Sequence, residues 1–466
     1  MRRLTRFTGQ ASPGWSMSLS AVQAARAIGD RVVSASEYVS DVLSSVSTHD
    51  TDHRAFVETY AESALRDAEV SDERLARGAG RPLEGVAFAV KDLIDIQGRR
   101  TRGASDSTSS DPVPCSDAEV VSRLRANGAI LVGKLALEEL GIGPTVENAY
   151  TAPPVNPWNP NRSTGGSSSG CAVAVAAGLV PFAIGTDTAG SIRLPAAHCG
   201  VVGFKPSYGF ISRRGVLSLS PTLDHIGIAT RNARDAELVL RAAAADPRID
   251  EPGSMSAARI AVVDFARGCT GFVDAEIAVA VEDAVAAMRA CGAEVEQKTM
   301  APLQAYQSGG ATILHAEAFE QHKTRLRRSG HLMQPSTYRR LASGSTIRGR
   351  DYTAARAVRE TLIRDFDRTM ENVDALVTIT TLRPPGPARD VDTSDDTSST
   401  LSPRMPFNVV GAPVIAVPIG LTTDGMPLSM QLIGARGADH RLLRIANAYE
   451  QAVGDGRVQW RMARRA

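Results

Sequence analysis

The sequence predicts an α/β protein whose β-sheet is covered by helices on both faces. Segments with apolar residues at helical spacing alternate along the chain with short segments that are continuously apolar. Uninterrupted apolar runs are typical of strands buried on both faces, and their alternation with helices is typical of α/β folds. The 466 residues, 43% of them hydrophobic, are also sufficient to bury a large core.

The N-terminal region is expected to be a tail followed by helices. Residues 1–16 are predicted to form a flexible tail, and residues 17–75 to be helical. Residues 34–37, Ser-Ala-Ser-Glu, match a capping box, and apolar residues follow them at helical spacing. The first residues are basic, but no apolar stretch follows them, so a secretory signal is not expected.

Two strands and a helix are predicted next. Residues 86–90 form an apolar run after a glycine and predict a buried strand with Lys91 at its end. Asp117 is interpreted as the N-cap of the following helix, which Asn-Gly ends at residues 127–128. Residues 129–132 then predict a second buried strand.

Loops rich in glycine and serine surround the next elements. Residues 151–170, dense in Pro, Asn, Gly and Ser, are expected to be a loop, and the apolar residues 171–177 a helix. Residues 182–184 predict a strand, and residues 185–191 a second loop that contains glycine. The rest of the chain continues the alternation with strand 259–263, helix 275–290, strand 292–295, mobile surface loop 384–403, strand 414–418 and helix 442–453.

Composition and charge argue against several classes of function. The net charge is +1 and the basic residues are scattered, so no nucleic-acid partner is expected. The most apolar stretch, residues 171–184, is too short to span a bilayer, so we expect no membrane association and a cytoplasmic location. The five cysteines include no C-x-x-C pair and are expected to be reduced, buried thiols. No His, Asp or Glu cluster has convincing metal spacing, and no metal or other cofactor is expected.

Three polar features stand where strands end or glycine-rich loops begin: Lys91, the serines of residues 165–170, and Ser191. Taken alone, each is typical of ordinary structure, namely a lysine at a strand end, a flexible linker and a turn. A serine hydroxyl is a poor nucleophile until another group accepts its proton. A lysine can accept it only when neutral, and its ordinary pKa of about 10.4 means that Lys91 would need desolvation. The apolar residues 86–90 can supply it.

The order and spacing of these features resemble the amidase signature family. The resemblance covers about residues 20–455 and is carried by residues 85–92, 163–170, 185–197, 199–206, 223–227, 406–408, 411–413 and 431–434. It implies a single α/β/α unit with a large mixed sheet over residues 17–466. This domain would comprise a helical segment at about 17–75, a catalytic core at about 80–255 and a variable, closing part at about 256–466.

The resemblance also implies a Ser–cis-Ser–Lys triad. In it, Ser191 is the nucleophile, Ser167 the bridging serine and Lys91 the base, and the peptide bond between Gly166 and Ser167 is cis. The implied oxyanion hole, which would bind the tetrahedral intermediate, consists of the backbone amides of Thr188, Ala189, Gly190 and Ser191.

Ala189 departs from the commonest family pattern, because many members have glycine there. Alanine is disfavoured if that position needs a positive φ. Behind the reacting groups, Ser168, Asp187 and Arg193 are expected to orient the loops. Arg193 is equally suited to hydrogen bonding within the loops and to a buried salt bridge with Asp187 or Asp224, and the sequence leaves these readings open.

The reaction that the resemblance implies is hydrolysis of a small-molecule carboxamide through a serine acyl-enzyme, without a cofactor. The alternative is a glutamine-hydrolysing subunit of a tRNA-dependent amidotransferase, which uses the same triad. We favour a stand-alone enzyme because of Ala189, Ser169 and Leu382-Arg383. We also expect a homodimer, as in many members of the family.

Two other classes fit the motifs less well. A nucleotide-binding module is disfavoured, because the Walker pattern is absent and residues 185–191 lack G-x-G-x-x-G. A Ser-His-Asp triad with His198 or His225 would need a G-x-S-x-G elbow, which Ala189 breaks. These histidines are expected to be structural or to line a pocket, and Cys171 and Cys199 are expected to pack in the core.

Overall fold

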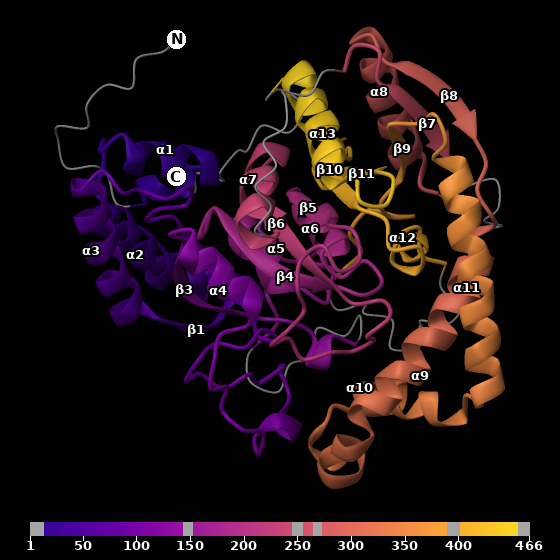
Figure 1. The fold of residues 1–466 in the computed structure, drawn as a ribbon, viewed down its shortest axis with the longest axis horizontal. Helices are drawn as coiled ribbons and strands as arrows, with labels where there is room; N and C mark the ends of the chain where they lie inside the picture. Colours follow the sequence, from indigo (N-terminus) through magenta and orange to yellow (C-terminus); the bar gives the residue numbers. More distant parts are fainter. Residues whose placement is uncertain (1–13, 143–151, 245–254, 264–272, 389–400, 455–466) are drawn as a thin grey trace.

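A large mixed sheet forms the centre of the protein in this computed structural model (Figure 1). The structure describes residues 14–142, 152–244, 255–263, 273–388 and 401–454. Within them the sheet has eleven strands in the order β1-β3-β2-β4-β6-β5-β10-β11-β9-β7-β8. The strands are β1 Phe56–Thr59, β2 Ala87–Lys91, β3 Ile130–Leu135, β4 Phe182–Asp187, β5 Val202–Lys205, β6 His225–Thr230, β7 Arg259–Val263, β8 Glu294–Lys298, β9 Ala375–Ile379, β10 Val414–Leu421 and β11 Pro427–Ile433.

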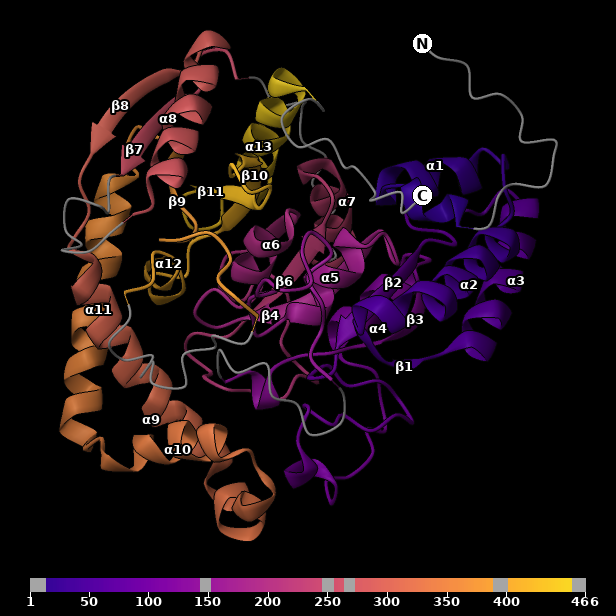
Figure 2. The ribbon, with the colours of Figure 1, turned by 180° about the vertical axis from the view of Figure 1, so that it is seen from behind.

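Helices pack on both sides of this sheet, as the two opposite views show (Figures 1 and 2). Helices α5 and α6 contact each other and the central strands, whereas α7 contacts α13 and α4. The long helices α9 and α11 lie side by side at one end of the molecule. The helices are α1 Ala21–Gly29, α2 Ala35–His53, α3 Ala61–Ala76, α4 Glu119–Ala126, α5 Ser169–Ala176, α6 Arg193–Cys199, α7 Ala233–Ala244, α8 Ala275–Ala290, α9 Leu303–Ser329, α10 Pro335–Ser343, α11 Gly349–Thr369, α12 Met405–Val409 and α13 Asp439–Val453. The predicted α/β class with a large mixed sheet is confirmed.

The N-terminal region is less uniformly helical than predicted. The capping box is present, because the Ser34 hydroxyl accepts the Glu37 amide and the Glu37 carboxylate accepts the Ser34 amide. However, β1 interrupts the helices and pairs antiparallel with β3 at the sheet edge. Part of the predicted tail is structured, since a 3₁₀-helix covers Trp15–Ser18, whereas residues 1–13 lie outside the described residues.

Two further predictions need correction. The N-cap of α4 is Ala118, because the Asp117 carboxylate instead accepts the Gln97 amide at 2.8 Å. Strand β4 extends to Asp187, so the second loop begins three residues later than predicted. The predicted loop at residues 384–403 lies partly outside the described residues.

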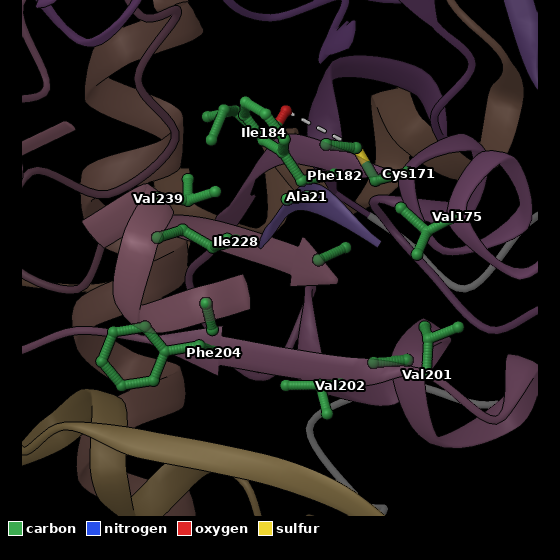
Figure 3. Close-up of a cluster of buried hydrophobic side chains, with 14 of the residues drawn as sticks. Ala21, Cys171, Val175, Phe182, Ile184, Val201, Val202, Phe204, Ile228 and Val239 are labelled. Atoms are coloured by element: carbon green, nitrogen blue, oxygen red, sulfur yellow. Dashed lines mark hydrogen bonds between the residues drawn. The ribbon is translucent and has the colours of Figure 1, made fainter. Parts of the chain in front are cut away.

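A buried apolar cluster fixes the elements that carry the candidate site (Figure 3). The Cys171 thiol of α5 donates to the Ile184 carbonyl of β4 at 3.6 Å, which holds the start of this helix on the strand. Next to it, Phe88 of β2 stacks on Phe182 of β4, with ring centroids 5.4 Å apart. These contacts set the relative positions of β2, β4 and α5 before any catalytic group is considered.

The cysteines follow the prediction in part. Cys171 and Cys199 are buried and unbridged, and Cys291 is half-buried. Cys115 is exposed, so the expectation of burial was wrong for this residue, which lies in the loop before α4. Cys269 falls outside the described residues. In the part of the chain that the structure describes, no helix is both long and apolar enough to cross a membrane.

Candidate active site

The candidate site forms at the carboxyl ends of two neighbouring parallel strands, β2 and β4. Lys91 is the last residue of β2 and is fully buried. Its Nζ donates to the Ser167 hydroxyl at 2.8 Å and to the Thr186 hydroxyl of β4, also at 2.8 Å. The two residues that the sequence predicts as base and bridging serine therefore lie in direct contact.

The ammonium of Lys91 lies in an environment that disfavours its charge. Burial lowers the pKa of Lys91 to about 8, against the opposing influence of nearby acids that include Glu138 and Asp187. No carboxylate oxygen within the described residues lies within 4.0 Å of the ammonium. Lys91 thus has hydroxyl partners rather than a counter-ion, an arrangement suited to a base.

The serine-rich segment is a fixed turn and not a flexible linker. The Gly166–Ser167 peptide bond is cis, and Ser167 is almost fully buried. The Ser168 amide donates to the Ser191 carbonyl at 3.0 Å, while the Ser168 hydroxyl donates to the Thr186 carbonyl at 3.0 Å. Ser168 therefore ties this segment to the end of β4 and to the loop that carries Ser191.

Ser191 lies in the short turn between β4 and α6. It is half-buried, and within the described residues its hydroxyl has no hydrogen-bond partner. The structure therefore brings the backbone of Ser191 next to Ser168 and leaves its hydroxyl free to meet a substrate. The hydroxyls of Ser191 and Ser167 are not hydrogen-bonded to each other in the described structure.

The carboxylate of Asp187 holds the Ser191 turn in place through hydrogen bonds. Its carboxylate accepts the amides of Gly190 at 2.9 Å and Ile192 at 3.3 Å, and it also accepts the Asn408 side chain at 2.8 Å. The Arg193 guanidinium pairs with both carboxylate oxygens, at 2.9 and 3.0 Å. Burial alone would raise the pKa of Asp187, but Arg193 and these donors hold it below its usual range.

The alternatives left open for Arg193 are thereby decided. Both Arg193 and Asp187 are fully buried, and their ion pair also supplies hydrogen bonds to the turn. Asp224 instead accepts the hydroxyls of Thr188 at 2.8 Å and Ser218 at 2.7 Å. Arg193 and Asp187 thus act together, while Asp224 restrains the other end of the turn.

The turn geometry revises the expected oxyanion donors. Positive φ falls on Gly190, at 114°, and not on Ala189, so alanine is compatible with its position. The Gly190 amide already donates to Asp187. Within the described residues, the amides of Thr188, Ala189 and Ser191 donate to no acceptor. These three amides, without that of Gly190, are the candidate oxyanion donors in this structure.

Comparison with known proteins gives the family. A family model described as Amidase matches residues 37–443. The chain belongs to the amidase family. It is therefore a hydrolase that acts on carbon–nitrogen bonds, and the predicted resemblance is confirmed.

Relatives of this amidase-family chain carry two kinds of name. Curated relatives named as a subunit of glutamyl-tRNA(Gln) amidotransferase include one from Roseiflexus sp. (strain RS-1), 34% identical over 90% of this chain and 93% of the relative. A crystal structure of an amidase has a TM-score of 0.86 and 31% identity, covering 94% of this chain and 100% of that one. A 6-aminohexanoate cyclic dimer hydrolase bound to its substrate has a TM-score of 0.84 and 26% identity, covering 94% and 97%.

Two further residues next to the candidate site, Thr186 and Glu138, were not singled out from the sequence. Thr186 binds Lys91 from the strand just before the glycine-containing turn, and Glu138 lies against Gly166. A β-carbon built on Gly166 would lie 1.7 Å from the Glu138 carboxylate, so a larger residue there would have to displace this side chain. Burial raises the pKa of Glu138 to about 8. Glu138 lies close to Ser167 in space but 29 residues before it in the chain. The sequence therefore gave no signal that the two residues meet.

A second group comes from the C-terminal part of the amidase domain. Asn408 and Gln431 bind Arg193 at 2.6 and 2.7 Å, and Arg404 lies over Gly190. Asn408 and Gln431 fall in two of the motifs that carried the family resemblance, and that is the signal that could have suggested a role for them.

The histidines near the motif do not form a catalytic triad in the described structure. The His225 ring binds the Leu223 carbonyl at 2.7 Å and lines a small cavity of about 30 Å³ beside Thr186 and Thr188. Burial lowers the pKa of His198 to about 3. In the described structure neither ring is hydrogen-bonded to Ser191. In the described part of the chain, no group of three or more His, Cys, Asp or Glu side chains is arranged to hold a metal ion.

Proposed function

We propose that the protein hydrolyses a carboxamide to a carboxylate and ammonia or an amine, with Ser191 as nucleophile, Ser167 as proton relay and Lys91 as base. One observation carries the proposal. The buried Lys91 ammonium, with its pKa lowered to about 8, has the Ser167 hydroxyl as a partner at 2.8 Å. A lysine in this environment is neutral in about one molecule in ten at pH 7, against fewer than about one in a thousand for an exposed lysine.

The proposed reaction has two halves. Neutral Lys91 accepts a proton from Ser167 as Ser167 accepts one from Ser191, and the Ser191 Oγ attacks the amide carbonyl carbon. The amides of Thr188, Ala189 and Ser191 stabilise the resulting oxyanion. The C–N bond then breaks as the leaving nitrogen takes up the proton held at Lys91. Water attacks the acyl-enzyme in the second half, which releases the acid and restores the Ser191 hydroxyl.

Two substrate assignments share this chemistry. The names of the curated relatives favour a glutamine-hydrolysing component of an amidotransferase over the stand-alone enzyme that we preferred from Ala189, Ser169 and Leu382-Arg383. The solved amidase and the cyclic dimer hydrolase support a stand-alone hydrolase of a small-molecule amide. An amidotransferase component is expected to release little ammonia from glutamine alone and more with its partner proteins, whereas a stand-alone enzyme needs no partner.

The test is ammonia release by the purified chain from aliphatic and aromatic amides, glutamine, malonamate and urea-derived carboxamides. Ser191→Ala should abolish release, whereas Ser169→Ala serves as the matched control, because it removes a buried serine of α5 that the proposed mechanism does not use. Ammonia release by Ser191→Ala at the wild-type rate would refute the proposed nucleophile. If glutamine is hydrolysed only together with a co-purifying protein, the amidotransferase assignment holds.

A further inference from the structure

Two arginines lie next to the Ser191 turn, and they differ in how many of their N–H groups have a hydrogen-bond acceptor. The first, Arg193, has five N–H groups and uses all five. They donate to the two Asp187 oxygens, the Arg404 carbonyl at 3.1 Å, Gln431 at 2.7 Å and Asn408 at 2.6 Å. This guanidinium has no donor left for a ligand.

The second, Arg404, is almost unpartnered. Its Nη1 donates to the Thr380 carbonyl at 2.7 Å, but its Nε is buried and has no acceptor. Within the described residues, no carboxylate lies within 4.0 Å of its guanidinium. Burial and the nearby Arg193 lower its pKa to about 10, so it keeps its charge at neutral pH.

The side chain of Arg404 reaches the residue that precedes the nucleophile. A β-carbon built on Gly190 would lie 2.6 Å from both Cδ and Nε of Arg404, so the arginine packs directly on the Gly190 backbone. The unpaired Nε of Arg404 therefore lies against the residue that precedes the proposed nucleophile Ser191.

A desolvated guanidinium without a counter-ion is unfavourable unless a ligand supplies the acceptor. Its planar fork suits a carboxylate, which can accept two N–H groups at once. We propose that Arg404 binds a carboxylate of the substrate, so that the preferred substrates are amides with a carboxylate close to the scissile bond. This inference rests on the proposed function and specifies its substrate class. It is compatible with both assignments above, because glutamine carries a carboxylate.

The first experiment compares succinamate with its neutral counterpart succinamide. Wild-type kcat/KM should be higher for succinamate, and Arg404→Met should lower it by about 10- to 100-fold for succinamate but by less than about threefold for succinamide. Arg66→Met is the control, because it removes an exposed positive charge from α3. An equal loss on both amides would mean that Arg404 only supports the fold, and would overturn the inference.

The second experiment measures binding without turnover. Calorimetric titration of Ser191→Ala with succinamate, malonamate and glutamine should show binding that Arg404→Met abolishes and Arg66→Met keeps. If Arg404→Met does not fold, Arg404→Lys replaces it, and loss of the planar fork should still weaken succinamate binding by about tenfold. If none of these three compounds binds to Ser191→Ala, the inference is overturned.

The two experiments separate the inference from the proposed function. Arg404-dependent binding without any Ser191-dependent turnover would refute the proposed function and keep the anion site. Ser191-dependent hydrolysis that ignores the carboxylate would keep the function and refute the anion site.

Discussion

At the scale of single residues, the candidate site depends on two buried ionisable side chains, Lys91 and Asp187. Lys91 has two hydroxyl partners in place of a counter-ion, and Asp187 is paired with Arg193. The environment of Lys91 lowers its pKa and so increases the share of the neutral, basic form, whereas that of Asp187 holds it in its anionic form. The same burial therefore produces two different roles.

The pH dependence of activity follows from the pKa of Lys91. The folded pKa, about 8, lies below that of an exposed lysine, so the active neutral form increases as pH rises through about 8. Below about pH 7, kcat/KM should fall about tenfold per pH unit, and above about pH 9 it should be constant. Rates measured between about pH 5.5 and 10 check this. Activity that declines from about pH 6 to pH 8 would contradict the assignment of Lys91 as base.

Glu138 should tune this pH profile. Its charge raises the pKa of Lys91, so Glu138→Gln should lower that pKa and move the acidic limb of the profile to lower pH. Measuring kcat/KM against pH for wild type and variant tests the direction. A limb that moves to higher pH would show that Glu138 does not act on Lys91 through its charge.

Asp187 should matter for stability as well as for activity. Asp187→Asn leaves the Arg193 charge buried without its partner, and breaking such a pair costs about 3–5 kcal/mol. The melting temperature should drop by several degrees. Asp30→Asn is the matched control, because its pair with Arg26 is exposed and surface pairs contribute little. Equal melting temperatures of the two variants would contradict the structural role of Asp187.

At the scale of elements, two short turns carry the proposed nucleophile and the proposed relay serine, and the strands hold these turns in place. The apolar runs predicted β2, β4, β7 and β10, because strands buried on both faces leave a continuous apolar signal. The edge strand β1 was missed, since it has only four residues and a half-exposed pattern. The Asp117 cap was wrong because that carboxylate binds the distant Gln97 amide.

The Ser191 turn needs glycine at position 190 for two reasons. The residue has φ of 114°, and a β-carbon there would meet Arg404 at 2.6 Å. Gly190→Ala should therefore reduce kcat/KM strongly, through displacement of Arg404 and the turn. Gly209→Ala separates the causes, because Gly209 also has positive φ, 77°, but an added β-carbon meets nothing within 4 Å. If both variants lose activity equally, the contact with Arg404 is not important.

At the scale of the whole molecule, the site joins segments far apart in the sequence. Motif resemblance was enough to predict Lys91, Ser167 and Ser191 as a group, because each lies within a recognisable segment. Arg404 could not be found in this way. Its guanidinium reaches the Ser191 turn only because the C-terminal strands join the same sheet as β4 and β5, and such long-range pairing leaves no local pattern.

We propose that residues 17–466 form one domain, because β10 from the closing part pairs directly with β5 from the core. The homodimer and the cytoplasmic location stay predictions. Light scattering of the purified chain measures its molar mass and so tests the homodimer. Co-purification with partner proteins would instead indicate an amidotransferase assembly.

The most direct test of the account is covalent labelling of the nucleophile. The protein is treated with phenylmethylsulfonyl fluoride, which modifies activated serines, and the labelled peptide is identified by mass spectrometry. We predict one adduct, on Ser191, that forms faster as pH rises through about 8 and is absent from Ser191→Ala but present in Ser169→Ala. An adduct on another serine, with amide hydrolysis lost in parallel, would contradict the assignment of Ser191 as the nucleophile.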